Sequence, residues 1–308
     1  MHNARFPGPE RDVQKALQGI SGVPVTPFDE RDRIQPAVLA KLIDRLAAAG
    51  IDNLVAAGNT GEFYALELEE VLAVYGHVVQ ANAGRSKVTA GVGRSLKEAQ
   101  VLARAAEKAG ADALMIHQPP DPFASPQGMV EYNHAVAGAT KLPVILYVRR
   151  DIFSDAEFAK LLDHPNIIGM KYAFPDAPKL AERIRQCRPL GKIAVCGLAE
   201  PWAAPFQAVG AQGFTSGLIN VLPSLSIEVR DALARGDYDT ARRACERIGP
   251  FEAMRAMQGN GWNVTVVKQA MRLMGHAVGP ARAPATPELP AAFSLELEKI
   301  LRNWGVLK

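Results

Sequence analysis

One lysine lies in a short apolar run that has the composition of a buried strand. The run, residues 166–174, has Lys171 near its C-terminal end and lies between Pro165 and Pro175. Its β-branched and aromatic residues favour a strand over a helix. Because burial penalises an ammonium ion, this lysine is expected to lose its proton readily and to attack a substrate carbonyl as an amine, forming a Schiff base. The alternative is a strand-end lysine that extends to water or pairs with a carboxylate.

Two other segments carry groups that would assist such chemistry. Residues 58–62, Gly-Asn-Thr-Gly-Glu, follow a predicted strand and lead toward a helix. Their backbone N–H groups are suited to surround an anion such as a carboxylate, although the same residue types also make ordinary turns. Tyr147 ends another predicted strand, where a phenol can carry protons to and from a substrate carbonyl. A tyrosine that only packs at that position is the alternative.

Further candidate site residues end other predicted strands. They are His117, Gly197 and Thr215. His117 is expected to pack rather than to catalyse, because no second histidine lies at the spacing of a metal site. The sequence therefore predicts a site without a metal.

The elements that would position these residues alternate regularly between strand and helix. The predicted pairs are 19–28 with 35–49, 53–57 with 67–81, 87–92 with 96–109, 113–117 with 127–139, 143–148 with 155–163, 166–174 with 178–187, 193–196 with 201–209, and 213–217 with 224–234. Eight such units predict an α/β fold, the (β/α)8 or TIM barrel, whose active sites lie at the C-terminal ends of the strands. A doubly wound sheet is the alternative, but residues 91–96 have leucine where its phosphate-binding motif requires a third glycine.

The chain divides into three predicted parts. Residues 1–18 are a polar N-terminal arm, residues 19–235 form the barrel, and residues 236–308 form a C-terminal helical extension. The extension lacks strand signals and contains three predicted helices, at 238–257, 263–274 and 290–304.

Composition excludes several classes of protein. The 308 residues are 48% hydrophobic and carry a net charge of +3, with basic and acidic residues interspersed, so neither a nucleic-acid partner nor a membrane is predicted. No stretch is apolar for long enough to span a bilayer. The three cysteines are far apart and odd in number, which argues against a disulfide framework or a zinc site and indicates a reduced, cytoplasmic setting.

Taken in order, these motifs resemble those of the dihydrodipicolinate synthase and N-acetylneuraminate lyase family. The resemblance rests on residues 58–64, on the tyrosine that ends the fifth strand and on Gly169-Met170-Lys171, and it extends over nearly the whole chain. It implies a cofactor-free mechanism in which Lys171 forms an imine with a 2-oxo acid and Tyr147 relays protons. It also implies a homo-oligomer, either a dimer or a tetramer.

The resemblance assigns roles to further residues. Thr60 would join the tyrosine in the proton relay, and the backbone around Gly58, Asn59, Thr60 and Gly61 would hold the substrate carboxylate. Gly197 and Thr215 would line the pocket. These assignments agree with the chemistry inferred from the residues themselves.

Departures from the family pattern bear on the substrate. In the true synthase an arginine stands five positions after the tyrosine and a further tyrosine lies in the loop after strand four, whereas this chain has Ile152 and the run 119–122, Pro-Pro-Asp-Pro. Residues 56–58 and Arg149 are more similar to the 5-dehydro-4-deoxyglucarate dehydratase branch, which acts on 2-keto-3-deoxy sugar acids. Arg149 or Arg150 is then a candidate to bind a distal carboxylate or sugar hydroxyls, with a surface or subunit-contact role as the alternative.

Three functions follow, in order of preference. The first is dehydration or aldol cleavage of a 2-keto-3-deoxy sugar acid through a lysine imine. The second is 4-hydroxy-tetrahydrodipicolinate synthase, which condenses pyruvate with aspartate semialdehyde. The third is a keto-acid or sugar-acid binding protein without turnover, which would have no need of a buried nucleophile.

Overall fold

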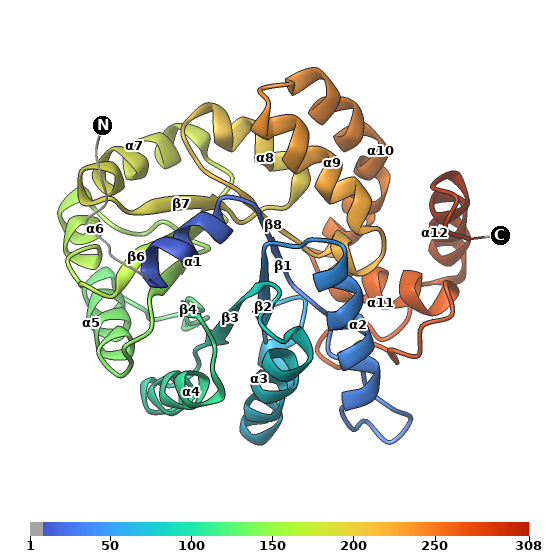
Figure 1. Cartoon of the computed structure of the whole chain (residues 1–308), viewed down its shortest axis with the longest axis horizontal. Coiled ribbons are helices and arrows are strands. Elements are labelled where there is room, and N and C mark those ends of the chain that lie inside the picture. Colours follow the sequence, from blue (N-terminus) through green and yellow to red (C-terminus); the bar gives the residue numbers. More distant parts are fainter. Residues whose placement is uncertain (1–8, 308) are drawn as a thin grey trace. The chain divides into compact units, whose positions relative to one another are not determined.

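The computed structural model describes residues 9–307 and contains a closed barrel of parallel strands in the order β1 to β8 (Figure 1). The strands are β1 (Ile20–Gly22), β2 (Asn53–Ala56), β3 (Lys87–Val92), β4 (Ala113–Ile116), β5 (Val144–Val148), β6 (Ile167–Tyr172), β7 (Ile193–Cys196) and β8 (Phe214–Ser216). The predicted TIM barrel is therefore confirmed.

Most helices begin and end within one or two residues of the predicted positions. They are α1 (Pro9–Leu17), α2 (Pro36–Ala48), α3 (Leu68–Asn82), α4 (Leu96–Ala109), α5 (Pro126–Ala137), α6 (Asp155–Leu161), α7 (Ala177–Cys187), α8 (Glu200–Ala208), α9 (Pro223–Ala234), α10 (Tyr238–Ala256), α11 (Asn263–Leu273) and α12 (Ala291–Asn303), with short 3₁₀ turns η1 (Phe63–Ala65), η2 (Arg188–Leu190) and η3 (Leu218–Asn220). Side-chain caps contribute to the accuracy of these limits. At α4, for example, Ser95 accepts from the Glu98 N–H in a capping box.

The chain forms two compact units. The first consists of residues 9–21, Asp52–Val55 and Ser86–Thr215, and it carries nearly all of the barrel strands together with α1 and α4 to α8. The second consists of Gly22–Ile51, Ala56–Arg85 and residues 216–307, and it carries α2, α3 and α9 to α12.

Helix α1 was not predicted, because the polar and Pro/Gly-containing N-terminal sequence hid a short apolar face. Val13 and Leu17, four residues apart, lie in one buried cluster with residues from the first three positions of strands β4 to β7. The Gln14 side chain also donates to the Ile168 carbonyl at 3.1 Å. In Figure 1, α1 lies beside β6, so it covers the N-terminal end of the barrel. Residues 1–8 of the expected arm lie outside the described part of the chain.

Strand β1 is much shorter than the predicted 19–28, because proline interrupts the ladder after Gly22. Pro24 and Pro27 have no N–H to donate to a neighbouring strand. The Val25 N–H instead donates to the Asn220 side chain at 3.0 Å, and the Phe28 N–H donates to the Val278 carbonyl at 3.0 Å. The second half of the predicted strand is therefore a loop of the second unit.

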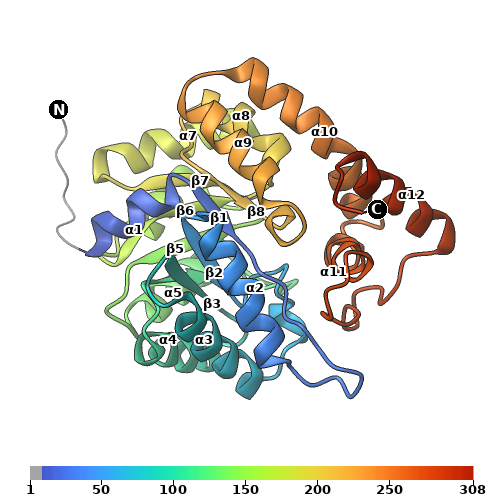
Figure 2. The same ribbon diagram turned by 45° about the vertical axis from the view of Figure 1, so that its right-hand side comes forward.

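The C-terminal helices of the second unit pack in succession, α9 on α10, α10 on α11 and α11 on α12 (Figure 2). Aromatic pairs hold this arrangement. The rings of Phe251 and Trp304 are 5.3 Å apart, and those of Trp262 and Phe293 are 4.8 Å apart. Across residues 9–307, no helix combines the length and apolar character needed to cross a membrane.

Candidate active site

Lys171 and Tyr147 meet at the C-terminal ends of neighbouring strands. They are register partners in the parallel pairing of β6 with β5. Both are buried, with 5% of Lys171 and 8% of Tyr147 exposed. The Lys171 Nζ atom lies 4.0 Å from the centroid of the Tyr147 ring. The predicted burial of the lysine is confirmed, and the tyrosine faces it, so an amine and a phenol share one small volume where barrel enzymes act.

The position of the tyrosine ring has a chemical consequence for an imine at Lys171. The face of an aromatic ring attracts a positive charge held within about 6 Å of its centroid. A protonated imine formed on Lys171 keeps a positive charge close to this nitrogen. The ring of Tyr147 is therefore placed to stabilise such an intermediate electrostatically.

Gly197, at the end of β7, gives the lysine side chain its space. A Cβ atom at this position would lie 3.0 Å from Lys171 Cγ and 2.9 Å from the Tyr172 carbonyl oxygen. A residue larger than glycine would therefore displace either the lysine or the end of β6. The resemblance predicts that Gly197 lines the substrate pocket, and the structure places this glycine beside Lys171.

Two other candidates of the first unit are buried at strand ends. The ring of His117, which follows β4, is 1% exposed, and its centroid is 5.8 Å from that of Tyr147. This contact restricts the tyrosine ring, in keeping with the packing role expected for the histidine. Thr215 lies on β8 and is 6% exposed.

The predicted carboxylate loop, residues 58–61, belongs to the second unit and directly follows the end of β2. Its turn closes through the Glu62 N–H, which donates to the Asn59 carbonyl at 3.0 Å, and the Phe63 N–H, which donates to the Gly58 carbonyl at 3.3 Å. The Thr26 hydroxyl donates to the Gly61 carbonyl at 2.7 Å. The loop thus has one defined backbone conformation, as an anion-binding turn requires.

Arg255 of α10 and Thr60 border the same glycine, Gly217, an arrangement that the sequence did not predict. A Cβ atom at Gly217 would lie 2.5 Å from Arg255 Nη2 and 3.2 Å from Thr60 Oγ1, so both groups border this glycine. The guanidinium is 4% exposed, donates to the Asn263 side chain at 2.9 Å and forms an ion pair with Glu252 at 2.5 Å. The C-terminal extension therefore brings a cation to the predicted substrate loop.

Arg149 and Arg150 follow β5, and both side chains are exposed. Their backbone, in contrast, is fixed by Gln118, a residue that was not among the predicted site residues. Gln118 Oε1 accepts from the N–H groups of both arginines at 2.8 Å, and Gln118 Nε2 donates to the Arg150 carbonyl at 3.1 Å. The turn is rigid, whereas the two guanidinium groups extend from it.

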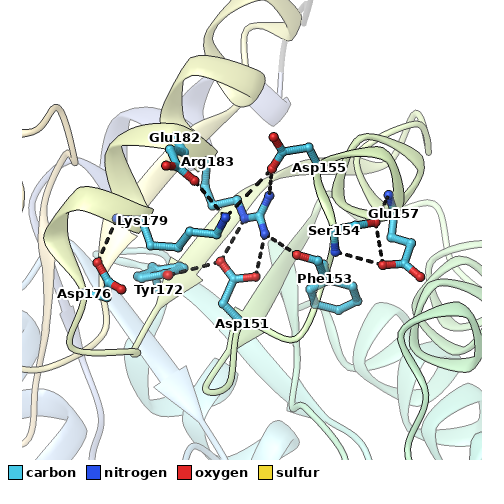
Figure 3. Close-up of polar contacts among 10 residues, drawn as sticks. All are labelled: Asp151, Phe153, Ser154, Asp155, Glu157, Tyr172, Asp176, Lys179, Glu182 and Arg183. Atoms are coloured by element: carbon cyan, nitrogen blue, oxygen red, sulfur yellow. Dashed lines mark hydrogen bonds and ion pairs between the residues drawn. The ribbon is translucent and has the colours of Figure 1, made fainter.

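A buried ion pair holds the rest of this loop (Figure 3). Asp151 accepts from Arg183 Nε and Nη2, each at 2.8 Å, and both side chains have no exposed surface. The hydroxyl of Tyr172, next to the catalytic candidate Lys171, donates to Asp151 at 3.1 Å. Burial, followed by the nearby Asp151 carboxylate, raises the pKa of the Tyr172 phenol well above its usual value. The pair ties the end of β6 to the loop after β5.

Arg183→Met is expected to destabilise the fold by roughly 3–5 kcal/mol, because the Asp151 carboxylate would stay buried without its cation. Urea unfolding measures this loss. Asp155→Ala is the matched control, since Asp155 bonds the same arginine at 2.9 Å but is 72% exposed. Its expected cost is about 0–1 kcal/mol. Equal costs for the two variants would contradict the assignment of the buried pair as the stabilising contact.

Two further observations concern metal and thiol chemistry. Among residues 9–307, no group of three or more His, Cys, Asp or Glu side chains is placed to share a metal ion. Cys187, Cys196 and Cys245 form no disulfide bond. Burial raises the pKa of Cys187 and of Cys196 to about 12, so neither is a reactive thiolate at neutral pH.

A buried lysine that faces a tyrosine at the C-terminal end of a TIM barrel defines a class of enzyme suited to imine chemistry. Comparison with known proteins identifies the family within this class. The chain belongs to the dihydrodipicolinate synthetase family, whose profile matches residues 16–303. It is an enzyme, a class I lyase that processes small molecules.

Relatives of known name fall into two groups. A Pseudomonas putida protein named 5-dehydro-4-deoxyglucarate dehydratase is 29% identical over 292 residues, covering 94% of this chain and 96% of its own. A Rhizobium rhizogenes protein named "Probable 5-dehydro-4-deoxyglucarate dehydratase" is 31% identical over 295 residues, covering 93% and 97%. The crystal structure of dihydrodipicolinate synthase from Bacillus clausii matches with a TM-score of 0.92 and 38% identity, covering 95% of this chain and 99% of that chain.

Proposed function

We propose that this lyase acts on a 2-keto-3-deoxy sugar acid by dehydration or aldol cleavage through an imine on Lys171. The observation that carries the proposal is the buried Lys171 Nζ atom 4.0 Å from the Tyr147 ring centroid. The names of the dehydratase relatives support this substrate class.

The proposed reaction begins with attack of the Lys171 amine on the C2 carbonyl and loss of water, which gives a protonated imine. Removal of a proton from C3 and departure of the C4 hydroxyl as water complete a dehydration. Removal of the C4 hydroxyl proton with breakage of the C3–C4 bond gives an aldol cleavage. In either case the imine accepts the electron pair, and Tyr147, with Thr60 by resemblance to the family, moves the protons, including the one that returns to the enamine carbon after aldol cleavage. Water then hydrolyses the remaining imine, which releases the product and the free Lys171 amine.

The carboxylate at C1 is assigned to the loop formed by Gly58, Asn59, Thr60 and Gly61. Its closed turn supports this role, because the hydrogen bonds from the Glu62 and Phe63 N–H groups to the Asn59 and Gly58 carbonyls fix the loop backbone, as an anion-binding turn requires. Gly197 and Thr215 are assigned to the pocket wall. The first of these roles is supported by the contact that a side chain at position 197 would make with Lys171.

The second candidate is 4-hydroxy-tetrahydrodipicolinate synthase, favoured by the 38% identity to the dihydrodipicolinate synthase of Bacillus clausii. Ile152 opposes this candidate, because an apolar side chain cannot bind the carboxylate of an aldehyde substrate as the arginine of the synthase does. The third function predicted from the sequence, a non-catalytic binding protein, is excluded by membership of this lyase family, and the burial of Lys171 also opposes it.

Borohydride trapping tests the proposal. The protein is incubated separately with pyruvate and with a 2-keto-3-deoxy hexarate, reduced, and analysed by intact mass and peptide mapping. We expect an adduct on Lys171 with both ligands, and release of a dehydrated or cleaved product from the hexarate alone. Absence of any adduct would return Lys171 to a structural role. Turnover of pyruvate with aspartate semialdehyde, without turnover of the hexarate, would favour the synthase.

One prediction concerns the arginine that binds a distal carboxylate. If Arg149 or Arg150 forms this pair, its change to alanine should raise KM for the dicarboxylic hexarate by roughly 10- to 100-fold, the range expected for a hydrogen bond between charged groups. KM for a monocarboxylic analogue should stay unchanged. Arg255→Met tests the buried arginine beside Thr60 in the same assay, and Arg185→Ala, an exposed arginine of α7, is the control. An unchanged KM in both Arg149→Ala and Arg150→Ala would remove these two arginines from the site.

The resemblance also supports a homo-oligomer, either a dimer or a tetramer, and light scattering of the purified protein tests this assignment. The number and spacing of the three cysteines support a reducing, cytoplasmic setting, and in the structure none of the three forms a disulfide.

A further inference from the structure

Glu62, the residue that follows the predicted substrate loop, has an unusual backbone conformation. Its φ is 63°, in the left-handed region that residues other than glycine rarely adopt. Its side chain is buried, with 6% of the residue exposed. Such a conformation persists only where the surroundings hold it. The contacts of the Glu62 carboxylate therefore determine how the loop ends.

Those contacts come from the C-terminal extension. Glu62 Oε2 forms a close ion pair with Lys268 Nζ of α11. Glu62 Oε1 accepts from the Arg282 backbone N–H at 2.7 Å. Lys268 is 1% exposed, donates to the Pro280 carbonyl at 3.0 Å and lies 4.1 Å from the centroid of the Phe28 ring. A helix and the segment that follows it thus hold one carboxylate.

A second layer of charge fixes the segment around Arg282. Its guanidinium bonds Glu70 of α3 at 2.6 and 2.8 Å and Asp32 at 2.7 Å. It also lies 3.8 Å from the centroid of the Phe28 ring, on which Lys268 rests. The charged groups around Lys268 are therefore Glu62 and Arg282, with Arg272 further along its own helix.

The ion pair is poorly explained as a device for stability. Burial raises the pKa of Glu62, and burial lowers the pKa of Lys268 to about 8 despite the adjacent carboxylate. For both groups, the effect of desolvation on the pKa is larger than the effect of the opposite charge beside it. A buried pair of this kind is weak support for stability, whereas it does fix one geometry for the groups that it joins.

We propose that Glu62 and Lys268 are positioning residues for the substrate-carboxylate loop, so that the C-terminal extension controls substrate affinity through α11. This inference rests on the proposed function, in which residues 58–61 bind the carboxylate of a 2-oxo acid. Lys268 does not touch the substrate in this scheme. It holds Glu62, and Glu62 holds the turn that closes on Asn59 and Gly58.

The test measures the pyruvate concentration that gives half-maximal borohydride trapping on Lys171. Lys268→Met keeps the side-chain length and removes the cation. We expect the half-saturating concentration to rise by roughly 10- to 100-fold, because small displacements of positioning groups have effects of this size. Arg272→Met is the matched control. Arg272 lies on the same helix as Lys268, its side chain is 27% exposed, and the change breaks its ion pair with Glu288. It should leave half-saturation unchanged.

The dependence on pH separates a positioning role from a purely structural one. In the wild type, the cation is present below pH 8 and is lost as pH rises through about 8, so half-saturation should increase across this range. The other charged groups that act on Lys268 are Glu62, Arg282 and Arg272. Lys268→Met should show the high half-saturating concentration at every pH between 7 and 9, without this increase.

A double variant, Glu62→Gln with Lys268→Met, keeps the test valid if the single variant does not fold, because it leaves no buried charge without a partner. We expect it to fold and to retain the raised half-saturation. Wild-type half-saturation in either variant would overturn the inference while leaving the imine mechanism intact. A wild-type protein that forms no imine would overturn the proposed function and this inference with it.

Discussion

Lys171→Ala is expected to abolish imine trapping and to lower turnover by roughly three orders of magnitude or more, the scale of nucleophile removal in covalent catalysis. The amine that attacks the carbonyl would be absent, and no other group in the mechanism can form the imine. Intact mass after borohydride reduction and steady-state turnover of the hexarate are the two measurements. Both should fall together, since the imine precedes every later step.

The loss must be separated from a failure to fold. Lys171 is 5% exposed, and its replacement by alanine leaves a small space in the site. Thermal unfolding of the variant should therefore remain cooperative. Lys97→Ala, which removes an exposed lysine of α4, is the control for nonspecific labelling. A Lys171→Ala protein with normal turnover would show that the imine mechanism is wrong.

Tyr147→Phe is expected to slow turnover by about two to four orders of magnitude while pyruvate still forms a trapped imine. Phenylalanine keeps the ring that lies 4.0 Å from Lys171 Nζ and packs against His117. Only the hydroxyl that carries the proton is lost. A change in kcat with little change in half-saturation for trapping is therefore the expected result.

Tyr172→Phe provides a matched control, because the same hydroxyl is removed one residue beyond Lys171. The Tyr172 hydroxyl bonds Asp151, on the opposite face of β6 from the lysine. We expect lower stability with turnover within about tenfold of the wild type, since a buried hydrogen bond to a charged group is lost. Wild-type turnover in Tyr147→Phe would remove the tyrosine from the proton relay and leave the role of Lys171 unaffected.

Local sequence patterns predict the barrel well. Residues 87–92 and 96–109 form a strand and a helix with the predicted limits. Period-two and period-3.6 patterns are local consequences of which face of an element is buried, so they can be seen in one sequence. Helix α1 was not predicted, because a short amphipathic helix among charged residues contains too few repeats of the apolar pattern to be recognised.

The position of Lys171, the candidate nucleophile, could also be predicted, whereas its surroundings could not. An apolar strand with one lysine near its end places that lysine at the mouth of a barrel, and Tyr147 and Gly197 follow from the same rule for β5 and β7. The tyrosine ring lies over Lys171 Nζ because of the register in which β5 pairs with β6. This register depends on how two strands pair, so it cannot be read from either strand's sequence alone.

The order of strands and helices can be read from the amino-acid sequence, as can the presence of a lysine, a tyrosine and a glycine-rich loop at strand ends. The contacts of charged residues from distant segments are visible only in the folded chain. Asp151 pairs with Arg183, Glu62 pairs with Lys268, and Arg255 borders the same glycine as Thr60. Burial patterns repeat over a few residues, whereas an ion pair between distant segments depends on how whole elements pack. In this lyase those distant contacts set the shape of the loops that carry Asp151, Thr60 and Glu62.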